Sequence, residues 1–108
     1  MFLFVAGWIL QTRRFPYWNN MDREHRLKRL RFRAWHRGTK EADMLIGGFF
    51  DRHCAVWNDA EIAWFEAFIE EQDVDIMAWA IGSAAPPTRW QGPMMETLRA
   101  VDYIEHKK

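Results

Sequence analysis

Helix start and stop signals follow one another at short intervals along this chain, and they constrain its fold more than any other feature. Asn58-Asp59-Ala60-Glu61 has the form of a capping box, in which side chains and backbone bond reciprocally at a helix start. Gly82 can stop a helix, and Pro93 suits the first helical position, where a missing N–H costs nothing. Apolar residues recur at helical spacing between these signals, and no alternating run favours a strand. We therefore predict an all-α fold, a compact bundle of five short helices.

The first two helices are expected to meet at a tight corner. The first should run from Asp22, as its cap, to about His36, with Gly38 ending it in the left-handed conformation. Thr39 can cap the second helix. That helix contains Gly47-Gly48, and each glycine inside a helix costs about 1 kcal/mol relative to alanine. Close packing of another helix against this pair would explain it.

The length of 108 residues fits one domain. We expect residues 1–21 to be a loose extension, or to follow from a mis-assigned start, and residues 22–108 to form the helical domain. Residues 1–10 are nearly all apolar, but about 20 such residues are needed to span a bilayer as a helix. No membrane insertion is therefore expected, although a short anchor on a membrane surface is an alternative.

Charge is distributed unevenly, although the formal net charge is zero. Residues 22–40 carry a net charge of +6, and residues 41–75 carry −9. The interpretation is either a strongly dipolar molecule, whose field steers a charged partner, or two solvated helix faces of opposite sign. Glu70-Glu71 and Asp75 fit a solvated face, and Asp73 can cap a fourth helix that ends at Ile81.

The sequence offers little catalytic or metal chemistry. Cys54 is the single cysteine, so no internal disulfide can form, and it is interpreted as a small packed hydrophobe. The four histidines are scattered, whereas a zinc site needs about four convergent nitrogen or sulfur ligands. We therefore predict no enzyme activity and no metal. Phe32 and Trp35 interleave with arginines, which raises a nucleic-acid hypothesis, but the acidic second half would repel a polyanion.

The corner itself carries the strongest functional pattern. Arg37, Gly38 and Glu41 fall together in the stretch from His36 to Glu41. Arginine is a forked donor for carboxylates and carbonyls, glycine permits close approach, and an acid at a helix start is held by the helix dipole. These residues can form a partner-binding corner. They can equally form a local Arg37–Glu41 ion pair beside a glycine cap.

The stretch from Arg26 to Gly38, with its basic run, is followed by Glu41, Asp43 and Phe49-Phe50, and it resembles the SdhE family of FAD assembly factors. The mark of that family is Arg-Gly-x-x-Glu. A second segment, Asp73-Val74-Asp75-Ile76 followed by Trp79, also fits. The resemblance covers roughly residues 22–82. His36 stands where many members carry a second arginine, and Thr39-Lys40 replace a commonly apolar pair.

The resemblance implies a five-helix, non-enzymatic assembly factor. It would bind the flavoprotein subunit of succinate dehydrogenase, or that of fumarate reductase, and promote covalent attachment of FAD to a histidine of that client. It would hold no FAD stably itself. The factor is expected to be monomeric when free, and to work in the bacterial cytoplasm or the mitochondrial matrix. The alternative is an antitoxin-like or nucleic-acid-binding module.

The same resemblance implies roles at the corner. Arg37 would donate hydrogen bonds to the client, Gly38 would allow the two backbones to approach, and Glu41 would accept hydrogen bonds or orient Arg37. Further residues are predicted to contact the partner around these three. They are Trp35, His36, Asp43 and Phe50.

Overall fold

The computed structural model describes residues 16–100, with side chains from residue 22 onward. Within that range the chain forms five α-helices and two short 3-10 helices, and it contains no strand. The α-helices are α1 (Pro16–Trp35), α2 (Lys40–His53), α3 (Asp59–Phe68), α4 (Asp73–Ile81) and α5 (Pro93–Ala100). The 3-10 helices are η1 (Cys54–Val56) and η2 (Thr88–Trp90). The predicted all-α bundle of five helices is confirmed.

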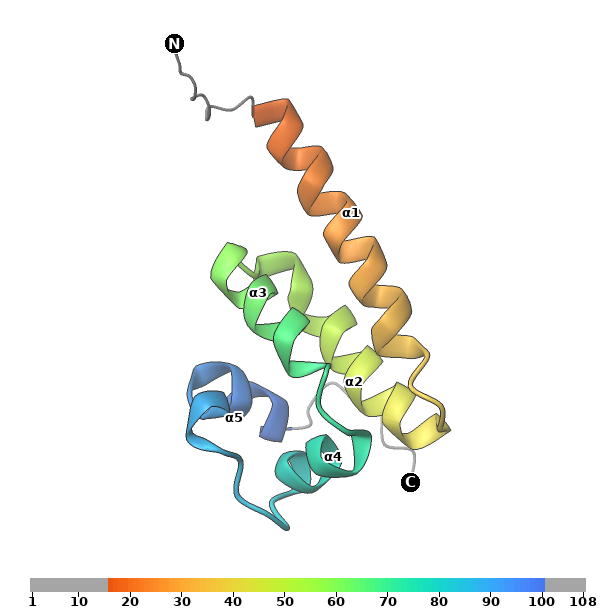
Figure 1. The fold of residues 1–108 in the computed structure, drawn as a ribbon, viewed down its shortest axis with the longest axis vertical. Helices are drawn as coiled ribbons and strands as arrows, with labels where there is room; N and C mark the ends of the chain where they lie inside the picture. The colour runs from red at the N-terminus through yellow and green to blue at the C-terminus, as the bar shows by residue number, and fades with distance from the viewer. Residues whose placement is uncertain (1–15, 101–108) are drawn as a thin grey trace.

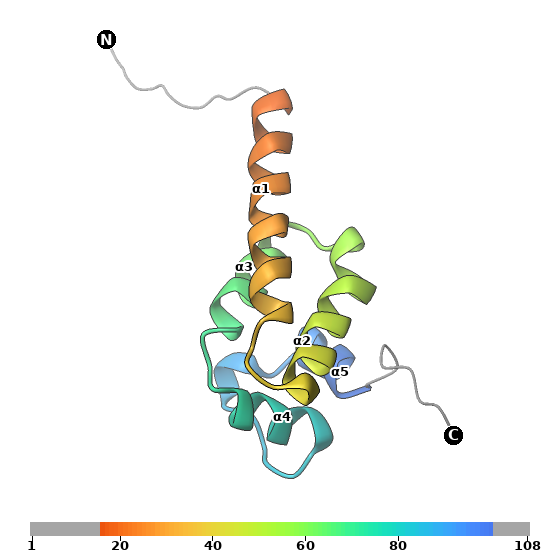
Figure 2. The same ribbon diagram turned by 90° about the vertical axis from the view of Figure 1, so that its right-hand side faces the viewer.

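Helix α1 runs along one side of the molecule, with α2 and α3 against its inner face and α4 and α5 beyond its C-terminal end (Figure 1). Figure 2, turned by 90°, shows α2 and α3 on either side of α1, with α4 near the corner that joins α1 to α2. None of the helices within residues 16–100 is both long and apolar enough to cross a bilayer.

The core forms where the apolar faces of the helices meet. Its largest members are fully buried phenylalanines, two from α2 and two from α3, and their rings lie against Trp57, Trp79 and Trp90. A buried phenylalanine contributes roughly 1.5–3 kcal/mol relative to an exposed one. Four apolar residues that recur at helical spacing along α2 are buried. They are Ala42, Leu45, Ile46 and Phe49.

Several helix boundaries follow the predicted capping chemistry. The Thr39 side chain accepts a hydrogen bond from the Ala42 N–H at 3.1 Å. Asn58 and Glu61 form the reciprocal capping box, with both bonds at 2.8 Å. Gly82 caps α4 with φ 87°, and Pro93 is the first residue of α5. Local hydrogen bonding therefore sets these ends, as the sequence indicated.

Three boundaries differ from prediction. Helix α1 begins at Pro16, so Asp22 lies inside the helix and does not cap it. Its end at Trp35 agrees with the predicted end near His36, but Gly38, with φ 119°, lies farther along the connection and does not cap the helix. The N-cap of α4 is Gln72, and Asp73 is the first helical residue. Residues 1–15 lie outside the described range, so the proposed domain boundary at residue 21 stays a prediction.

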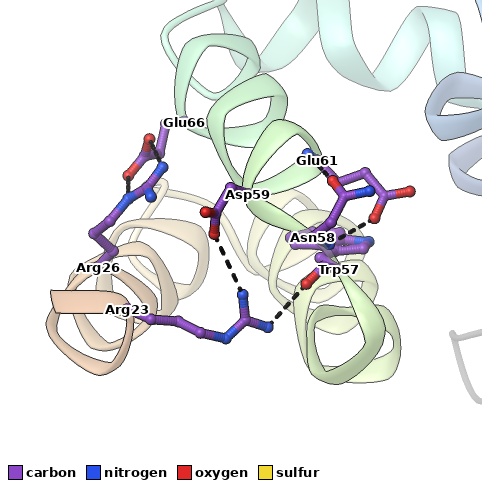
Figure 3. A network of polar contacts seen from close by, with 7 residues as sticks. All are labelled: Arg23, Arg26, Trp57, Asn58, Asp59, Glu61 and Glu66. Atoms are coloured by element: carbon purple, nitrogen blue, oxygen red, sulfur yellow. Dashed lines mark hydrogen bonds and ion pairs between the residues drawn. The ribbon is translucent and has the colours of Figure 1, made fainter. Parts of the chain in front are cut away.

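Opposite charges in the two halves of the sequence pair with each other across the helix contacts. Arg23 lies 3.9 Å from Asp59, and Arg26 binds Glu66 through two hydrogen bonds of 3.0 and 2.8 Å (Figure 3). Further along α1, Arg31 pairs with Asp51 at 3.6 Å. The strong dipole expected from the sequence is thus reduced, because many charges are neutralised locally.

Candidate functional site at the α1–α2 corner

The connection between α1 and α2 is anchored by Arg37. Its Nε donates to Asp73 Oδ1 at 2.7 Å, and its Nη2 donates to the Glu71 carbonyl at 3.1 Å. The Arg37 N–H also donates to Asp43 Oδ1 at 2.6 Å. One residue therefore ties the corner to the start of α4 through its side chain and to α2 through its backbone.

This arrangement bears on both interpretations of Arg37. Its side chain is only 11% exposed, so the guanidinium faces inward and is not presented freely to solvent. Its acidic partner is Asp73, 36 residues away, and the ion pair with Glu41 that was the alternative prediction is not formed. Two of the five N–H donors of the guanidinium are used in these bonds. The two segments that carry the family resemblance are therefore in direct contact.

Gly38 and Glu41 remain on the outside of the corner. Gly38 has φ 119°, a conformation that side-chain-bearing residues rarely adopt, and a Cβ placed on it would meet nothing within 4 Å. Glu41 is exposed in the first turn of α2, where the helix dipole favours a carboxylate. The corner thus offers an uncovered stretch of backbone next to an exposed acidic side chain.

An open pocket of about 610 Å³ lies beside Gly38. Its walls combine the apolar surfaces of Trp35 and Met44 with the polar groups of His36 and Lys40. Its remaining lining residues are Gly38, Thr39 and Asp43. Of these, Lys40, Thr39 and Met44 were not among the predicted partner-binding residues. Thr39 and Lys40 directly follow Gly38 in the sequence, which was a usable signal, whereas Met44 lies six residues after Gly38.

Trp35 has a structural role in addition to lining this pocket. A Cβ on Gly47 would lie 2.3 Å from Trp35 Cδ2, so the indole ring of α1 rests directly on the α2 backbone. Trp35 Nε1 also donates to Asp51 at 3.1 Å. Close approach of a neighbouring helix was expected at Gly47-Gly48, and the contact at Gly47 confirms it.

The other two predicted contact residues occupy different environments. His36 is exposed, and its ring stacks on Phe32 with centroids 3.9 Å apart. Phe50 is fully buried and packs against Trp57 and Phe65. Phe50 therefore belongs to the core, and its ring is not available at the surface of this structure.

Glu70 and Glu71, expected on a solvated face, both bind other elements. Glu70 pairs with Arg33 of α1. The Glu71 carboxylate accepts hydrogen bonds from Trp90 Nε1 and Arg89, and these bonds hold its pKa below the ordinary value. Because the Glu71 carbonyl accepts from Arg37, this residue joins the corner to η2.

The described residues contain no group of three or more side chains that could hold a metal ion. Cys54 is buried, and burial raises the pKa of its thiol, which disfavours the reactive thiolate. Polar and apolar groups instead gather at the exposed corner and its pocket. The fold and this corner define a small all-α protein with a surface suited to contacting another macromolecule.

Comparison with known proteins agrees with this class. Residues 28–102 match the family described as Sdh5, flavinator of succinate dehydrogenase. The chain belongs to this family. The "FAD assembly factor SdhE" of Acetobacter pasteurianus is 36% identical over 73 residues, which cover 68% of this chain and 67% of that protein.

Mitochondrial proteins of fungi are also similar. The "succinate dehydrogenase assembly factor 2, mitochondrial" of Cryptococcus neoformans is 32% identical over 72 residues, which cover 66% of this chain and 41% of that protein. The protein of the same name from Mycosarcoma maydis is 32% identical over 77 residues, covering 71% of this chain and 32% of that protein. The matched part is thus less than half of each of these two proteins.

Proposed function

We propose that this protein binds the flavoprotein subunit of succinate dehydrogenase and promotes covalent attachment of FAD to it. The family match over residues 28–102 carries the proposal, since the matched region contains the whole corner. The name of the Acetobacter relative supports the same activity. The bond-forming chemistry belongs to the flavin and to the client, and this chain contributes positioning.

Within this proposal, two groups of residues at the corner have different roles, one in contacting the client and one in holding the contact surface in place. Gly38 and Glu41 form the contact surface, because both are exposed and the space around Gly38 is open. Arg37 and Asp43 hold that surface in place through their bonds to each other and, for Arg37, to the start of α4. Trp35 and His36 extend the contact along the adjoining pocket.

We also propose that the protein is monomeric when it is not bound to its client and holds no FAD stably. It acts in the same compartment as its client. That compartment is the bacterial cytoplasm or the mitochondrial matrix, because relatives occur in a bacterium and in mitochondria. Purified protein should therefore lack flavin absorbance. Stoichiometric flavin in the isolated protein would contradict this part of the proposal.

Glu41→Ala tests the contact role. We expect covalent flavin incorporation into the client to slow about tenfold or more, because a lost charge-assisted hydrogen bond is worth roughly 1.5–3 kcal/mol. In-gel flavin fluorescence of the denatured client measures the rate. Glu96→Gln, an exposed acid on α5, is the matched control and should leave the rate unchanged.

The thermal midpoint of the Glu41 variant should stay close to that of the unmodified protein, because Glu41 is exposed. Unfolding of the variant would show that the corner is needed for stability alone. Normal flavin incorporation by a folded variant would remove Glu41 from the contact surface.

A further inference from the structure

The basic residues of α1 are sorted onto different faces of the helix. Arg23, Arg26, Arg31 and Arg33 each pair with an acidic residue of α2, α3 or the segment that follows α3. Other residues of α1 recur three or four positions apart. At 3.6 residues per turn they therefore share the face of α1 that is turned away from α2 and α3. This outer stripe consists of His25, Lys28, Arg29, Phe32 and His36.

All five residues of the outer stripe are exposed. No ion pair among the described residues involves Lys28 or Arg29. In Figure 1 the other helices of residues 16–100 lie on one side of α1, so within this described range no helix covers its outer side. The two cations are therefore available to a partner, in contrast to the arginines of the inner face.

Phe32 is the apolar centre of the stripe. Its side chain is 63% exposed, yet it is not loose, because the His36 ring stacks on it at 3.9 Å and 19°. His36 Nδ1 also lies 2.6 Å from the Phe32 carbonyl oxygen, within hydrogen-bonding distance. An aromatic ring that is already ordered loses little conformational freedom on binding, which favours a role as an anchor.

We propose that the outer stripe is a second docking surface, which binds an acidic segment of the flavoprotein client with an apolar residue or pocket for Phe32. This inference rests on the proposed function. His36 connects the two surfaces, since it belongs to the stripe and also lines the pocket beside Gly38. A client seated on the corner would thus continue along α1.

The charges favour an acidic protein segment over a nucleic acid. Most cations of α1 are neutralised by carboxylates within the chain, and the remaining pair, Lys28 and Arg29, is too small for the many phosphate contacts that a polyanion supplies. Two cations beside an aromatic anchor instead suit a few carboxylates around one apolar contact.

Binding of the purified flavoprotein subunit of succinate dehydrogenase, measured by calorimetry, tests the stripe. We expect Phe32→Ala to weaken binding about tenfold, as for a central aromatic anchor. Ile81→Ala is the matched control, because Ile81 is 71% exposed on α4, and its binding should be unchanged. Equal affinities for the Phe32 variant and the unmodified protein would overturn the proposal.

A second pair of variants tests whether the positive charge of the stripe contributes to binding of the client. Arg29→Gln and Arg99→Gln each remove one positive charge from an exposed arginine, on α1 and α5 respectively. Arg29→Gln should weaken binding several-fold in low salt and flatten its salt dependence, because charge pairs at a surface are screened. Arg99→Gln should do neither. If both substitutions weakened binding equally, the effect would depend only on the net charge of the protein, and the role of the stripe would be overturned.

Glu41→Ala separates failure of this inference from failure of the proposed function. Loss of binding by the Glu41 variant with normal binding by both stripe variants would retain the corner and reject the stripe. Absence of binding by the unmodified protein would reject both. Stripe variants that impair binding to RNA or self-association, while the client binds normally, would also overturn the proposal.

Discussion

Arg37 shows how a single residue acquires a role that its neighbours in sequence do not reveal. Its sequence position, next to glycine and four residues before an acid, suggested either an outward donor or a local ion pair. The structure places its guanidinium against Asp73 and the Glu71 carbonyl with an exposed fraction of 11%. At the residue scale, the Arg37 side chain is thus bonded to the start of α4, and Gly38 and Glu41 are the exposed members of the corner.

Asp73→Asn tests the contribution of this bond. The change removes the charge that balances a largely buried guanidinium, so we expect a loss of about 1–3 kcal/mol in the free energy of unfolding, measured with urea. Asp75→Asn lies in the same first turn of α4 but is exposed, and should have little effect. Equal stability of the two variants would show that the Arg37–Asp73 bond contributes nothing to the fold.

Packing of α1 against α2 decides the angle of the corner at the scale of elements. The Trp35 ring lies on the α2 backbone at Gly47, and its N–H reaches Asp51 one turn further along. The absence of a side chain at Gly47 is therefore required by the neighbouring helix. The helix-propensity cost of the glycine is offset by the contact that it allows.

Gly47→Ala should destabilise the protein, although alanine is about 1 kcal/mol better than glycine in an isolated helix. The added methyl would lie 2.3 Å from the indole ring, and overpacking of this kind costs roughly 1–3 kcal/mol. Thermal unfolding followed by circular dichroism measures the change. In a Trp35→Ala background the same substitution should become neutral or favourable, and persistence of the penalty there would refute the clash.

At the scale of the whole molecule, charge pairs line the contacts between α1 and the other helices. The pairs run from Arg23–Asp59 and Arg26–Glu66 to Arg37–Asp73 near the other end. Each exposed pair contributes only about 0–1 kcal/mol, so the inward face of α1 is set mainly by the buried Leu30 and Ala34, and the charge pairs flank that face. The remaining face carries the outer stripe, so internal neutralisation also defines the docking surface.

Low pH should weaken the Arg26–Glu66 pair and thereby lower the stability of the fold. The two hydrogen bonds from Arg26 hold the pKa of Glu66 below its ordinary value of 4.5. A carboxyl whose pKa is lower in the folded state contributes stability that is present above its unfolded pKa and is lost as the pH falls through the folded pKa. Stability should therefore decrease below about pH 4.5, and Glu66→Gln should reduce that decrease.

Unfolding free energies between pH 3 and pH 7, from urea titrations, measure the effect. Glu24→Gln is the matched control, because Glu24 is exposed on α1 and its substitution should leave the acid dependence unchanged. A Glu66 variant with the same pH dependence as the unmodified protein would assign the acid sensitivity to other carboxylates.

Sequence alone determined the features that depend on local bonds. Helix type, the Thr39 cap, the Asn58–Glu61 capping box and the stop at Gly82 are set by residues within a few positions of each other. The family resemblance also followed from short-range patterns, and the match over residues 28–102 confirmed it. The start of α1 was missed because a helix can extend wherever no residue prevents it, and Asp22 was only one possible cap.

Tertiary structure alone decided which opposite charges meet and which side chains stay exposed. Arg37 and Asp73 are 36 residues apart, and Phe50 lies in the core while Phe32 lies outside. Both outcomes depend on how helices pack, since pairing and burial require groups that are distant in sequence to come within a few ångströms. The inward arginine and the free outer face of α1 are therefore properties of the assembled bundle.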